Sequence, residues 1–501
     1  MLALPARTVE VAAAVAVLAR LPFVGHAPGP DEAGQLLVGA QWDGHGSSLY
    51  GSYWVDRPPL LITIFRCASF LGGMPAVRAI GCLAVLAIVL GCARVAATLR
   101  DEDAARWAAV AAAALCLTPD LGGYEVNGEL LAAPFVLAGM VAVVSAVRSA
   151  HRATALRWAA TGGAAAACAL LVKQNLADVV VFGAVAYALA WARHDIGRRR
   201  AAELLGASVA GLAATALVVA MWTVAHGTSL HGVFDAMYPF RIHADQAISA
   251  GGGGHATARL HALGRAALVS GLVAMVAVAA VHPAVRRARS PFGWALLATA
   301  AFAVASALMG GSYWHHYLVE LVAPASVGVG LLAGRGVRVA RVVVAYAVLS
   351  ALALWCVGLT HPQGGSGQVV GRAVGAVAAP HDSLVTLWGR PDILATSGLH
   401  SPYDQLWSLP VKTLDPRLSR LDRVLTGDSA PTWLVTGPTV RSWGLQTTRT
   451  QAIIDRDYRH VRTICGRRIY LHVGIARRPP PRPPDCTGSP SFTARVQEVA
   501  P

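Results

Sequence analysis

Residues 76–98 read AVRAIGCLAVLAIVLGCARVAAT, and this stretch decides the fold class. Only Arg78 and Arg94 interrupt an apolar run that is long enough, as a helix, to cross the ~30 Å hydrocarbon core of a bilayer. Similar apolar blocks recur along the first two thirds of the chain. We place eleven of them, at residues 9–25, 76–98, 107–118, 130–147, 158–172, 176–192, 203–225, 263–281, 293–309, 316–333 and 340–358.

The composition agrees with a membrane protein. Of the 501 residues, 55% are hydrophobic and only 14% are charged, whereas a soluble domain carries about 25% charged residues. The mean hydropathy is +0.51. The apolar blocks follow neither a heptad nor a Gly-X-Y period, which excludes a coiled coil and collagen. The sequence therefore predicts a mainly α, polytopic membrane helical bundle with about eleven transmembrane helices.

The net charge of +15 does not indicate a nucleic-acid partner, because most of the arginines stand in short clusters between apolar blocks, as in cytoplasmic loops. With the N-terminus inside, only Arg57, Lys173, Arg241 and Arg259 lie in outer loops. The inner loops then hold fifteen arginines: Arg100, Arg106, Arg148, Arg152, Arg157, Arg193, Arg198, Arg199, Arg200, Arg286, Arg287, Arg289, Arg335, Arg338 and Arg341. This asymmetry predicts a multi-pass protein of the cell membrane whose residues after about 360 are extracytoplasmic. An alternative, that block 9–25 is a signal peptide, leaves the next segment outside as well.

Three regions follow from this map: a transmembrane domain at 1–360 with a first external loop at 26–75, an extracytoplasmic α/β domain at 361–476, and a proline-rich tail at 477–501 that we expect to be disordered. Strands are predicted at 383–388, 432–436, 461–465 and 468–473, with helices at 368–379, 391–397 and 449–458. Cys465 and Cys486 are the only cysteines outside the membrane region, and the sequence leaves open whether they form a disulfide.

The outer loops carry the residues that suggest chemistry. Asp31 and Glu32 follow the first apolar block and begin an amphipathic run, residues 33–42, at the membrane surface. A carboxylate held there can take a proton from a hydroxyl beside a lipid-bound substrate, although capping of a helix is a competing role for Asp31. For the other acids Asp43, Asp120 and Asp235, a solvated surface charge is the simpler interpretation.

The same loop continues as LYGSYWVDRPPL at residues 49–60. Two prolines stiffen the backbone, and the aromatic side chains suit an interface or a sugar ring. Arg57, Arg78 and Lys173 all lie at the outer boundary, where a cation is costly unless it is paired or meets an anion. Converging cations suit a phosphate-bearing lipid, while snorkelling or pairing with a nearby acid remains the alternative for each of them.

Three motifs in this order resemble the GT-C glycosyltransferases: Pro30-Asp31-Glu32, Asp56-Arg57-Pro58-Pro59-Leu60 and Ala76-Val77-Arg78-Ala79-Ile80-Gly81. The protein O-mannosyltransferases and the lipid A aminoarabinose transferases look most similar, over roughly residues 1–335. Leu171-Val172-Lys173-Gln174 is similar to a Lys-Gly segment of these families, with glutamine replacing glycine. Asn127-Gly128-Glu129 matches an acidic position of the second external loop, for which Glu125 is an equal match. Tyr313-Trp314-His315-His316-Tyr317 resembles a late His-Tyr segment, with His315 where proline is usual.

The resemblance implies an integral membrane glycosyltransferase that moves a hexosyl or pentosyl group from a polyprenyl-phosphate donor to an extracytoplasmic protein, lipid or polysaccharide acceptor. Asp31 would be the base of an inverting transfer, with Glu32 its catalytic neighbour. The donor phosphate would lie on Arg78, Lys173 and Arg57. Substrate contacts would come from a larger set: Asp56, Glu125, Glu129, His316, Tyr53 and Trp54.

No cofactor is required, and a divalent cation held by His315, His316 and the carboxylates remains an open alternative. The external domain has no catalytic motif, so we expect it to recruit the acceptor or to gate the cavity. A transporter or flippase would explain the apolar-block acids Asp178 and Glu320, but it predicts inverted repeats, and the sequence has none. A non-catalytic envelope assembly protein is the third class considered.

Overall fold

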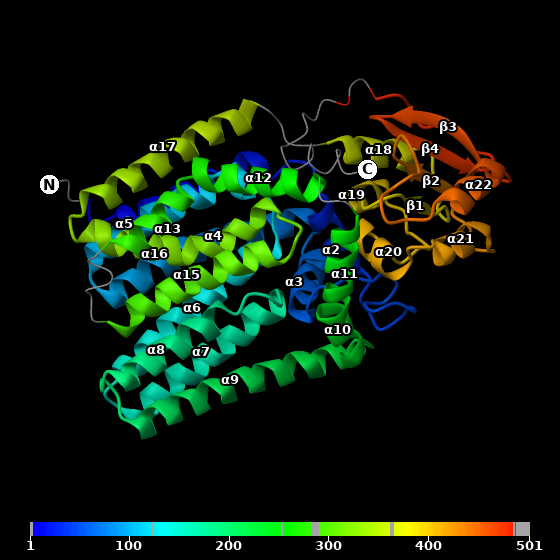
Figure 1. The fold of residues 1–501 in the computed structure, drawn as a ribbon. Coiled ribbons are helices and arrows are strands. Elements are labelled where there is room, and N and C mark those ends of the chain that lie inside the picture. Colours follow the sequence, from blue (N-terminus) through cyan, green and yellow to red (C-terminus); the bar gives the residue numbers. More distant parts are fainter. Residues whose placement is uncertain are drawn as a thin grey trace.

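The computed structural model describes residues 4–122, 124–251, 254–282, 290–360, 365–483 and 486. A long helical bundle carries a smaller α/β domain at one end, here called the outer domain (Figure 1). Of the predicted inner-loop arginines, Arg286, Arg287 and Arg289 lie outside the described residues, as do residues 487–501 of the tail.

The helices of the bundle and of its loops run to Thr360. They are α1 (Thr8–Leu18), η1 (Leu21–Phe23), α2 (Pro30–Ala40), α3 (Pro59–Phe70), α4 (Met74–Leu99), α5 (Glu102–Leu117), η2 (Pro119–Leu121), α6 (Gly128–Arg148), α7 (Arg152–Val172), α8 (Asp178–Ala192), α9 (Arg198–Ala225), α10 (Leu230–Met237), α11 (Pro239–Ala250), α12 (Gly254–Val269), α13 (Leu272–Val281), α15 (Pro291–Met309), η3 (His315–Leu321), α16 (Val322–Gly334) and α17 (Arg338–Thr360).

The chain is a polytopic membrane protein, as predicted, but its spans are more varied than the eleven apolar blocks suggested. Within the described residues, seven helices are long and apolar enough to cross a membrane, or up to eight if the pair of helices at 256–269 and 272–281, bent by 70°, forms one span. The predicted blocks at 9–25, 107–118 and 176–192 correspond to α1, α5 and α8, helices of 11, 16 and 15 residues that fall short of the length of a full span. A further short apolar helix, α3, lies inside the first external loop.

At one end of the bundle, arginines donate to the last carbonyl groups of neighbouring helices; the outer domain lies at the other end of the bundle (Figure 1). Arg148 donates to the carbonyl of Leu99 at 3.3 Å, Arg100 donates to Leu331 at 3.4 Å, and Arg200 donates to Val147 at 3.2 Å. These bonds occupy the carbonyl groups that helix ends leave without a partner. Three of the arginines predicted for the inner loops, Arg100, Arg148 and Arg200, thus hold the ends of neighbouring helices.

The outer domain is built on a four-stranded sheet in the order β1-β2-β4-β3. β1 pairs with β2 in parallel, and the other two pairings are antiparallel. Its elements are α18 (Ser366–Gly375), β1 (Leu384–Thr386), α19 (Pro391–Ser397), α20 (Ser408–Leu414), α21 (Ser419–Thr426), β2 (Trp433–Thr436), α22 (Thr448–Asp457), β3 (Tyr458–Ile464) and β4 (Arg467–His472). Each predicted strand overlaps an observed strand, and the predicted helices correspond to α18, α19 and α22.

The start of the proline-rich tail is attached to the outer domain. Arg477 forms an ion pair with Asp382, with an Nη2–Oδ1 distance of 2.8 Å, and a disulfide joins Cys465 to Cys486. The expectation of disorder from Arg477 onward is therefore wrong for this first part, because an ion pair and a covalent bond hold it.

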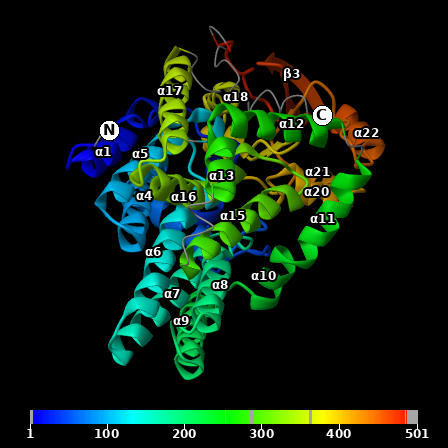
Figure 2. The same cartoon turned by 60° about the vertical axis from the view of Figure 1, so that its left-hand side comes forward.

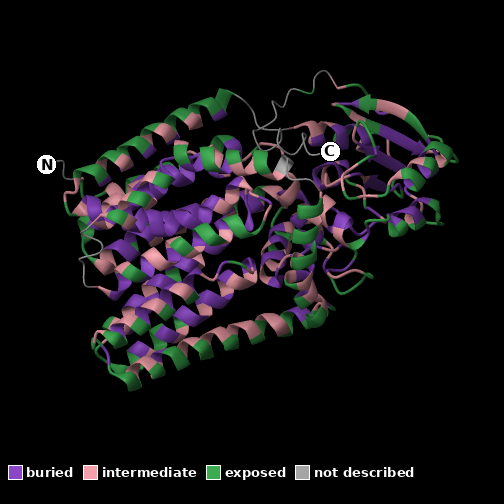
Figure 3. Cartoon of the chain, viewed as in Figure 1, coloured by how far each residue is buried: buried purple, intermediate pink, exposed green. Residues whose placement is uncertain are grey.

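The outer domain and the first external loop share one hydrophobic core. Trp42, Tyr50 and Val55 of the loop pack in the same buried cluster as Leu384 and Trp433 of the sheet. A second cluster fills the other side of the sheet, and a third runs through the bundle, where burial is most continuous (Figure 3). Helices α10 and α11 lie beside the outer domain, and α11 contacts α20 (Figure 2). The loop, α10–α11 and the outer domain thus meet above one end of the bundle.

Candidate active site

The two acids of the first external loop stand in the first turn of α2. Pro30 occupies the first helical position, where its fixed φ suits a helix start, and acidic side chains in this turn are favoured by the helix dipole. Neighbouring residues of a helix project about 100° apart, so Asp31 and Glu32 face different surroundings. The sequence predicted one acidic pair, but the structure gives the two side chains separate partners.

Glu32 is buried in a closed network. Its Oε2 accepts from Nη2 of Arg78 at 2.7 Å and from the backbone N–H of Gly29 at 3.1 Å. Its Oε1 accepts from the backbone N–H of Val126 at 2.7 Å. Burial raises the pKa of Glu32, while Arg78 and the two backbone donors oppose that rise.

Arg78 is equally occupied. Besides Glu32, its guanidinium donates to the carbonyl of Tyr124, and the side chain is 4% exposed. The pairing with a nearby acid, which the sequence left open for this cation, is therefore present. Together Glu32 and Arg78 tie α2 to α4 and to the loop before α6.

Asp31 contacts the outer domain. The indole Nε1 of Trp407 donates to its Oδ1 at 2.8 Å. Gly34, one turn further along α2, allows this approach, because a Cβ there would lie 2.3 Å from Cζ2 of Trp407. Among the residues that the structure describes, Oδ2 of Asp31 has no hydrogen-bond partner, so this oxygen is available to a substrate.

A group of cations lies within electrostatic reach of Asp31. Asp56 forms ion pairs with Nη1 of Arg57 at 3.0 Å and with Nε of Arg241 at 3.1 Å. Burial lowers the pKa of Arg57, but the charges of Asp56 and Asp31 outweigh it and raise that pKa above its ordinary value. Arg57 and Asp31 are therefore neighbours in the folded protein.

Lys173 approaches the same group from the end of α7. Its Nζ pairs with Oε1 of Glu129 and lies 4.6 Å from the centre of the Tyr317 ring. Nε2 of His316 is 3.8 Å from the same Glu129 oxygen. The charges of Asp31 and Arg57 also act on His316. His316 is therefore close both to Lys173 and to the ion pairs of Asp56. We call Arg57, Arg241 and Lys173 the cation cluster.

Glu125 lies beside the Glu32 network, where its Oε1 would be 2.9 Å from a Cβ on Gly29. Burial and then the charge of Glu32 raise the pKa of Glu125 to about 7. This carboxyl group therefore changes its charge near neutral pH, unlike an ordinary glutamate.

Tyr53 and Trp54, the two aromatic residues predicted to contact the substrate, have different surroundings. Tyr53 is buried in the core shared with the outer domain, and its hydroxyl accepts from the backbone N–H of Ser401 at 3.0 Å, so it holds the outer domain. Trp54 is half-buried and packs edge-on against Phe240, with ring centres 4.7 Å apart.

Among the described residues, no three His, Cys, Asp or Glu side chains form a group that could hold a metal ion. His316 lies near Glu129, whereas the neighbouring groups that act on the charge of His315 are His316 and Arg265, both of which disfavour a positive charge there. A basic residue beside His315 does not fit a site for a divalent cation.

Two residues of this site were not singled out from the sequence. Trp407 lies 376 positions after Asp31, and no sequence signal indicated the contact. Arg241 was one of four basic residues assigned to outer loops, which was a usable signal.

No protein-family model matches the sequence, and no curated protein is similar to it. Solved structures are similar in fold. ArnT from Cupriavidus metallidurans bound to undecaprenyl phosphate has a TM-score of 0.59 and 13% identity, over 93% of this chain and 97% of that chain. The Archaeoglobus fulgidus oligosaccharyltransferase AglB, in complex with an inhibitory peptide and a dolichol-phosphate, has a TM-score of 0.54 and 12% identity, over 86% and 69% of the two chains. The chain therefore has the GT-C fold of polytopic membrane proteins.

Proposed function

We propose that this protein is a membrane glycosyltransferase that moves a sugar from a polyprenyl-phosphate donor to an acceptor hydroxyl on the extracytoplasmic side. One observation carries the proposal: among the described residues Asp31 has an oxygen without a partner, and its charge acts on Arg57, which belongs to the cation cluster. A base and a phosphate site are the two elements that this transfer needs. The fold shared with proteins bound to undecaprenyl phosphate and dolichol-phosphate supports the same class of donor.

In the proposed reaction, Asp31 accepts the proton of the acceptor hydroxyl through Oδ2. The acceptor oxygen forms a bond to the anomeric carbon from the side opposite the phosphate, and the bond between that carbon and the phosphate oxygen breaks. Configuration is therefore inverted. The leaving polyprenyl phosphate gains a negative charge, which a group of cations stabilises in a site with little water.

We assign the donor phosphate to Arg57, Lys173 and Arg241. Within the part of the chain that the structure describes, these three cations form ion pairs with two acids, Asp56 and Glu129, so the cluster has one positive charge more than its ion-pair partners. The sequence had assigned the phosphate to Arg78 and a catalytic role to Glu32. Arg57 and Lys173 also pair with acids, but Glu32 has both oxygens engaged, by Arg78 and by two backbone N–H groups. We therefore assign Glu32 and Arg78 to holding α2, and with it Asp31, in place.

Trp407 acts as a positioning residue in this proposal. Its N–H occupies one oxygen of Asp31 and leaves the other directed to the acceptor. The outer domain then gates the site through this contact, in line with the role expected from the sequence.

The orientation rests on the arginines at the opposite end of the bundle. Basic loops are retained in the cytoplasm, so the end with Arg100, Arg148 and Arg200 is inside, and Asp31 and the outer domain are outside.

The test begins with lipid analysis of a deletion strain, which should accumulate one polyprenyl-phosphate sugar. That lipid then serves as the donor for purified protein. Asp31→Asn should lower turnover by about 10²–10⁴-fold while donor binding persists. Asp43→Asn is the matched control, because Asp43 is an exposed acid of the same loop that only accepts from the N–H of His45 at 3.0 Å. Full activity in Asp31→Asn would remove Asp31 as the base, and a deletion strain without an accumulating lipid would contradict the donor class.

A further inference from the structure

A cavity of about 500 Å³ lies where three distant parts of the chain meet. The first external loop supplies Ser48 and Trp54, helices α10 and α11 supply Asp235 and Phe240, and the outer domain supplies Asp404 and Arg420. Its volume is in the range of small-molecule sites. From the sequence alone, Asp235 was interpreted as a surface charge, and the other lining residues except Trp54 had no role.

The cavity adjoins the proposed reaction centre on two sides. Trp54 is two residues before Asp56, and Phe240 directly precedes Arg241, so these lining residues lie within about 7 Å of the Asp56 ion pairs along the backbone. Asp404 is three residues before Trp407, which contacts Asp31, a backbone reach of at most about 11 Å. A molecule in the cavity is therefore near both the base and the cation cluster.

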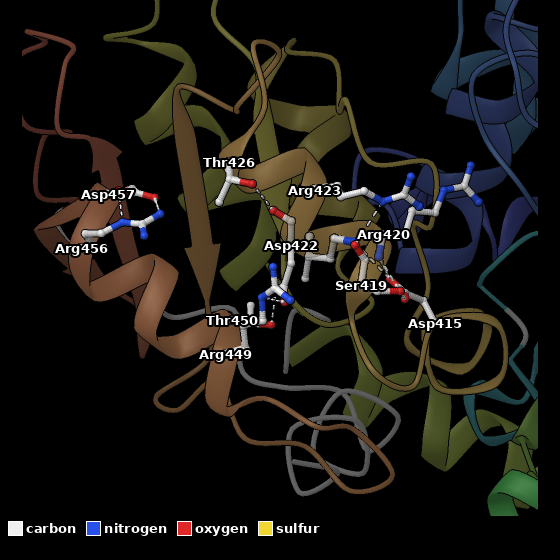
Figure 4. A network of polar contacts seen from close by, with 11 residues as sticks. Asp415, Ser419, Arg420, Asp422, Arg423, Thr426, Arg449, Thr450, Arg456 and Asp457 are labelled. Carbon is white, nitrogen blue, oxygen red and sulfur yellow. Dashed lines mark hydrogen bonds and ion pairs between the residues drawn. The ribbon is translucent and has the colours of Figure 1, made fainter.

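The polar groups of the cavity are held in place. Oδ2 of Asp404 accepts from Ser48 Oγ and from Gln405 Nε2, both at 3.0 Å, and pairs with Nη2 of Arg420 at 3.0 Å. Arg420 stands in the first turn of α21, where its backbone N–H donates to Asp415 at 3.2 Å (Figure 4). This arrangement fixes a carboxylate, a guanidinium and a hydroxyl around one space.

Among the described residues, the cavity has no surplus of basic side chains. Arg420 neutralises Asp404, and Oδ2 of Asp235 lies 2.7 Å from Nδ1 of His231. The cavity therefore lacks the excess of cations that an anionic ligand requires. The cavity offers a ligand two kinds of group. The half-buried indole of Trp54 has an apolar face, and the polar oxygen and nitrogen atoms can form hydrogen bonds with hydroxyls.

These features fit a sugar ring, which has an apolar C–H face and several hydroxyls around its edge. A peptide in extended conformation would instead pair with the open edge of a strand, and no strand of the four-stranded sheet lines this cavity. We infer that the cavity is the acceptor site and that it binds a neutral saccharide, whose hydroxyl is presented to Asp31. The inference rests on the proposed glycosyltransferase function and specifies its acceptor.

The test measures transfer from the accumulated donor to short neutral manno- and gluco-oligosaccharides and, separately, to a peptide that contains Ser and Thr. We expect transfer to an oligosaccharide by the wild type. Trp54→Ala and Asp235→Asn should each raise the KM for that oligosaccharide about tenfold or more, equivalent to about 1.4 kcal/mol, with a smaller change in kcat. Trp54→Phe retains a ring and should recover part of the affinity.

Trp388→Phe serves as the control, because Trp388 lies in the outer domain and donates to the carbonyl of Val440 rather than lining the cavity. Thermal unfolding of each variant shows whether it is folded. Transfer to the peptide and not to an oligosaccharide, or an unchanged KM in folded Trp54→Ala and Asp235→Asn, would overturn the inference and leave the glycosyltransferase intact. Absence of donor turnover with every acceptor and with water would instead contradict the proposed function.

Discussion

Removal of the indole N–H of Trp407 tests whether the outer domain positions Asp31. Trp407→Phe keeps an aromatic ring against Gly34 but deletes the 2.8 Å hydrogen bond to Oδ1 of Asp31. A hydrogen bond to a charged group contributes about 1.5–3 kcal/mol. If that free energy serves to hold the carboxylate in its reactive position, its loss lowers kcat about tenfold to a hundredfold.

The assay is transfer of the donor sugar by purified protein in lipid, with kcat and the donor KM determined separately. We expect kcat to fall and the donor KM to stay within about twofold, since the cation cluster is untouched. In an Asp31→Asn background, Trp407→Phe should have little further effect, because both changes act on one carboxylate.

Trp388→Phe is again the matched control, since it removes an indole hydrogen bond of 3.1 Å in the same domain without touching Asp31. Wild-type kcat in Trp407→Phe, or an equal loss in Trp388→Phe, would refute the positioning role. A fall in thermal stability with unchanged kcat would mean that the contact only attaches the domain.

Three further predictions concern stability. Arg78→Ala leaves Glu32 buried without its cation and should lower the free energy of unfolding by about 3–5 kcal/mol. This loss is seen as a large fall in Tm, which Arg78→Lys should reverse in part. A stable Arg78→Ala protein that fails to bind donor would return the phosphate to Arg78. Because burial and Glu32 raise the pKa of Glu125 to about 7, the folded protein binds a proton there that the unfolded chain releases, so this group's contribution to stability falls as the pH rises from about 4.5 to about 7. Glu125→Gln should thus have a higher Tm than wild type at about pH 8 and a similar Tm at about pH 5, and equal differences at both values would contradict the shift. The disulfide joins Cys465 to Cys486, at a sequence separation of 21. Its reduction should destabilise the outer domain by about 3 kcal/mol, measured by thermal unfolding. An unfolding transition that stays unchanged after verified reduction would disprove this contribution.

Much of the fold follows from local patterns in the sequence. Long apolar runs such as residues 76–98, and short β-rich runs separated by polar and turn residues, are local signals, so α4 and the strands of the sheet could be predicted. The number of long spans could not, because helix length depends on caps and packing rather than on apolar composition. α8 ends after 15 residues and α1 after 11, although both lie in blocks that looked long enough to cross.

The candidate site, like the fold, has one part that the sequence indicates and another part that it does not. Asp31, Arg57 and Lys173 were candidates on the sequence alone, because each stands at the edge of an apolar block, where a charged side chain is costly unless it is paired or binds a ligand. Their functional roles stay predictions. Their partners could not be predicted, since pairing depends on tertiary contacts. Arg78 was a candidate for phosphate or for an acid, and only the 2.7 Å contact with Glu32 decides for the acid.

The contact between α7 and α9 has a consequence for how the protein responds to the thickness of its bilayer. A Cβ on Gly163 would lie 1.8 Å from the carbonyl oxygen of Ser208, and one on Gly211 would lie 2.0 Å from that of Ala160, so the two backbones touch. Apart from this line, α9 is largely exposed, and its 28 residues extend about 42 Å, more than the hydrocarbon thickness. Such a helix accommodates the mismatch by tilting, and we expect it to tilt about the paired glycines. α9 is followed by α10 and then by α11, which carries Arg241, whereas α7 ends at Lys173. Membrane thickness is therefore expected to adjust the spacing of these two cations.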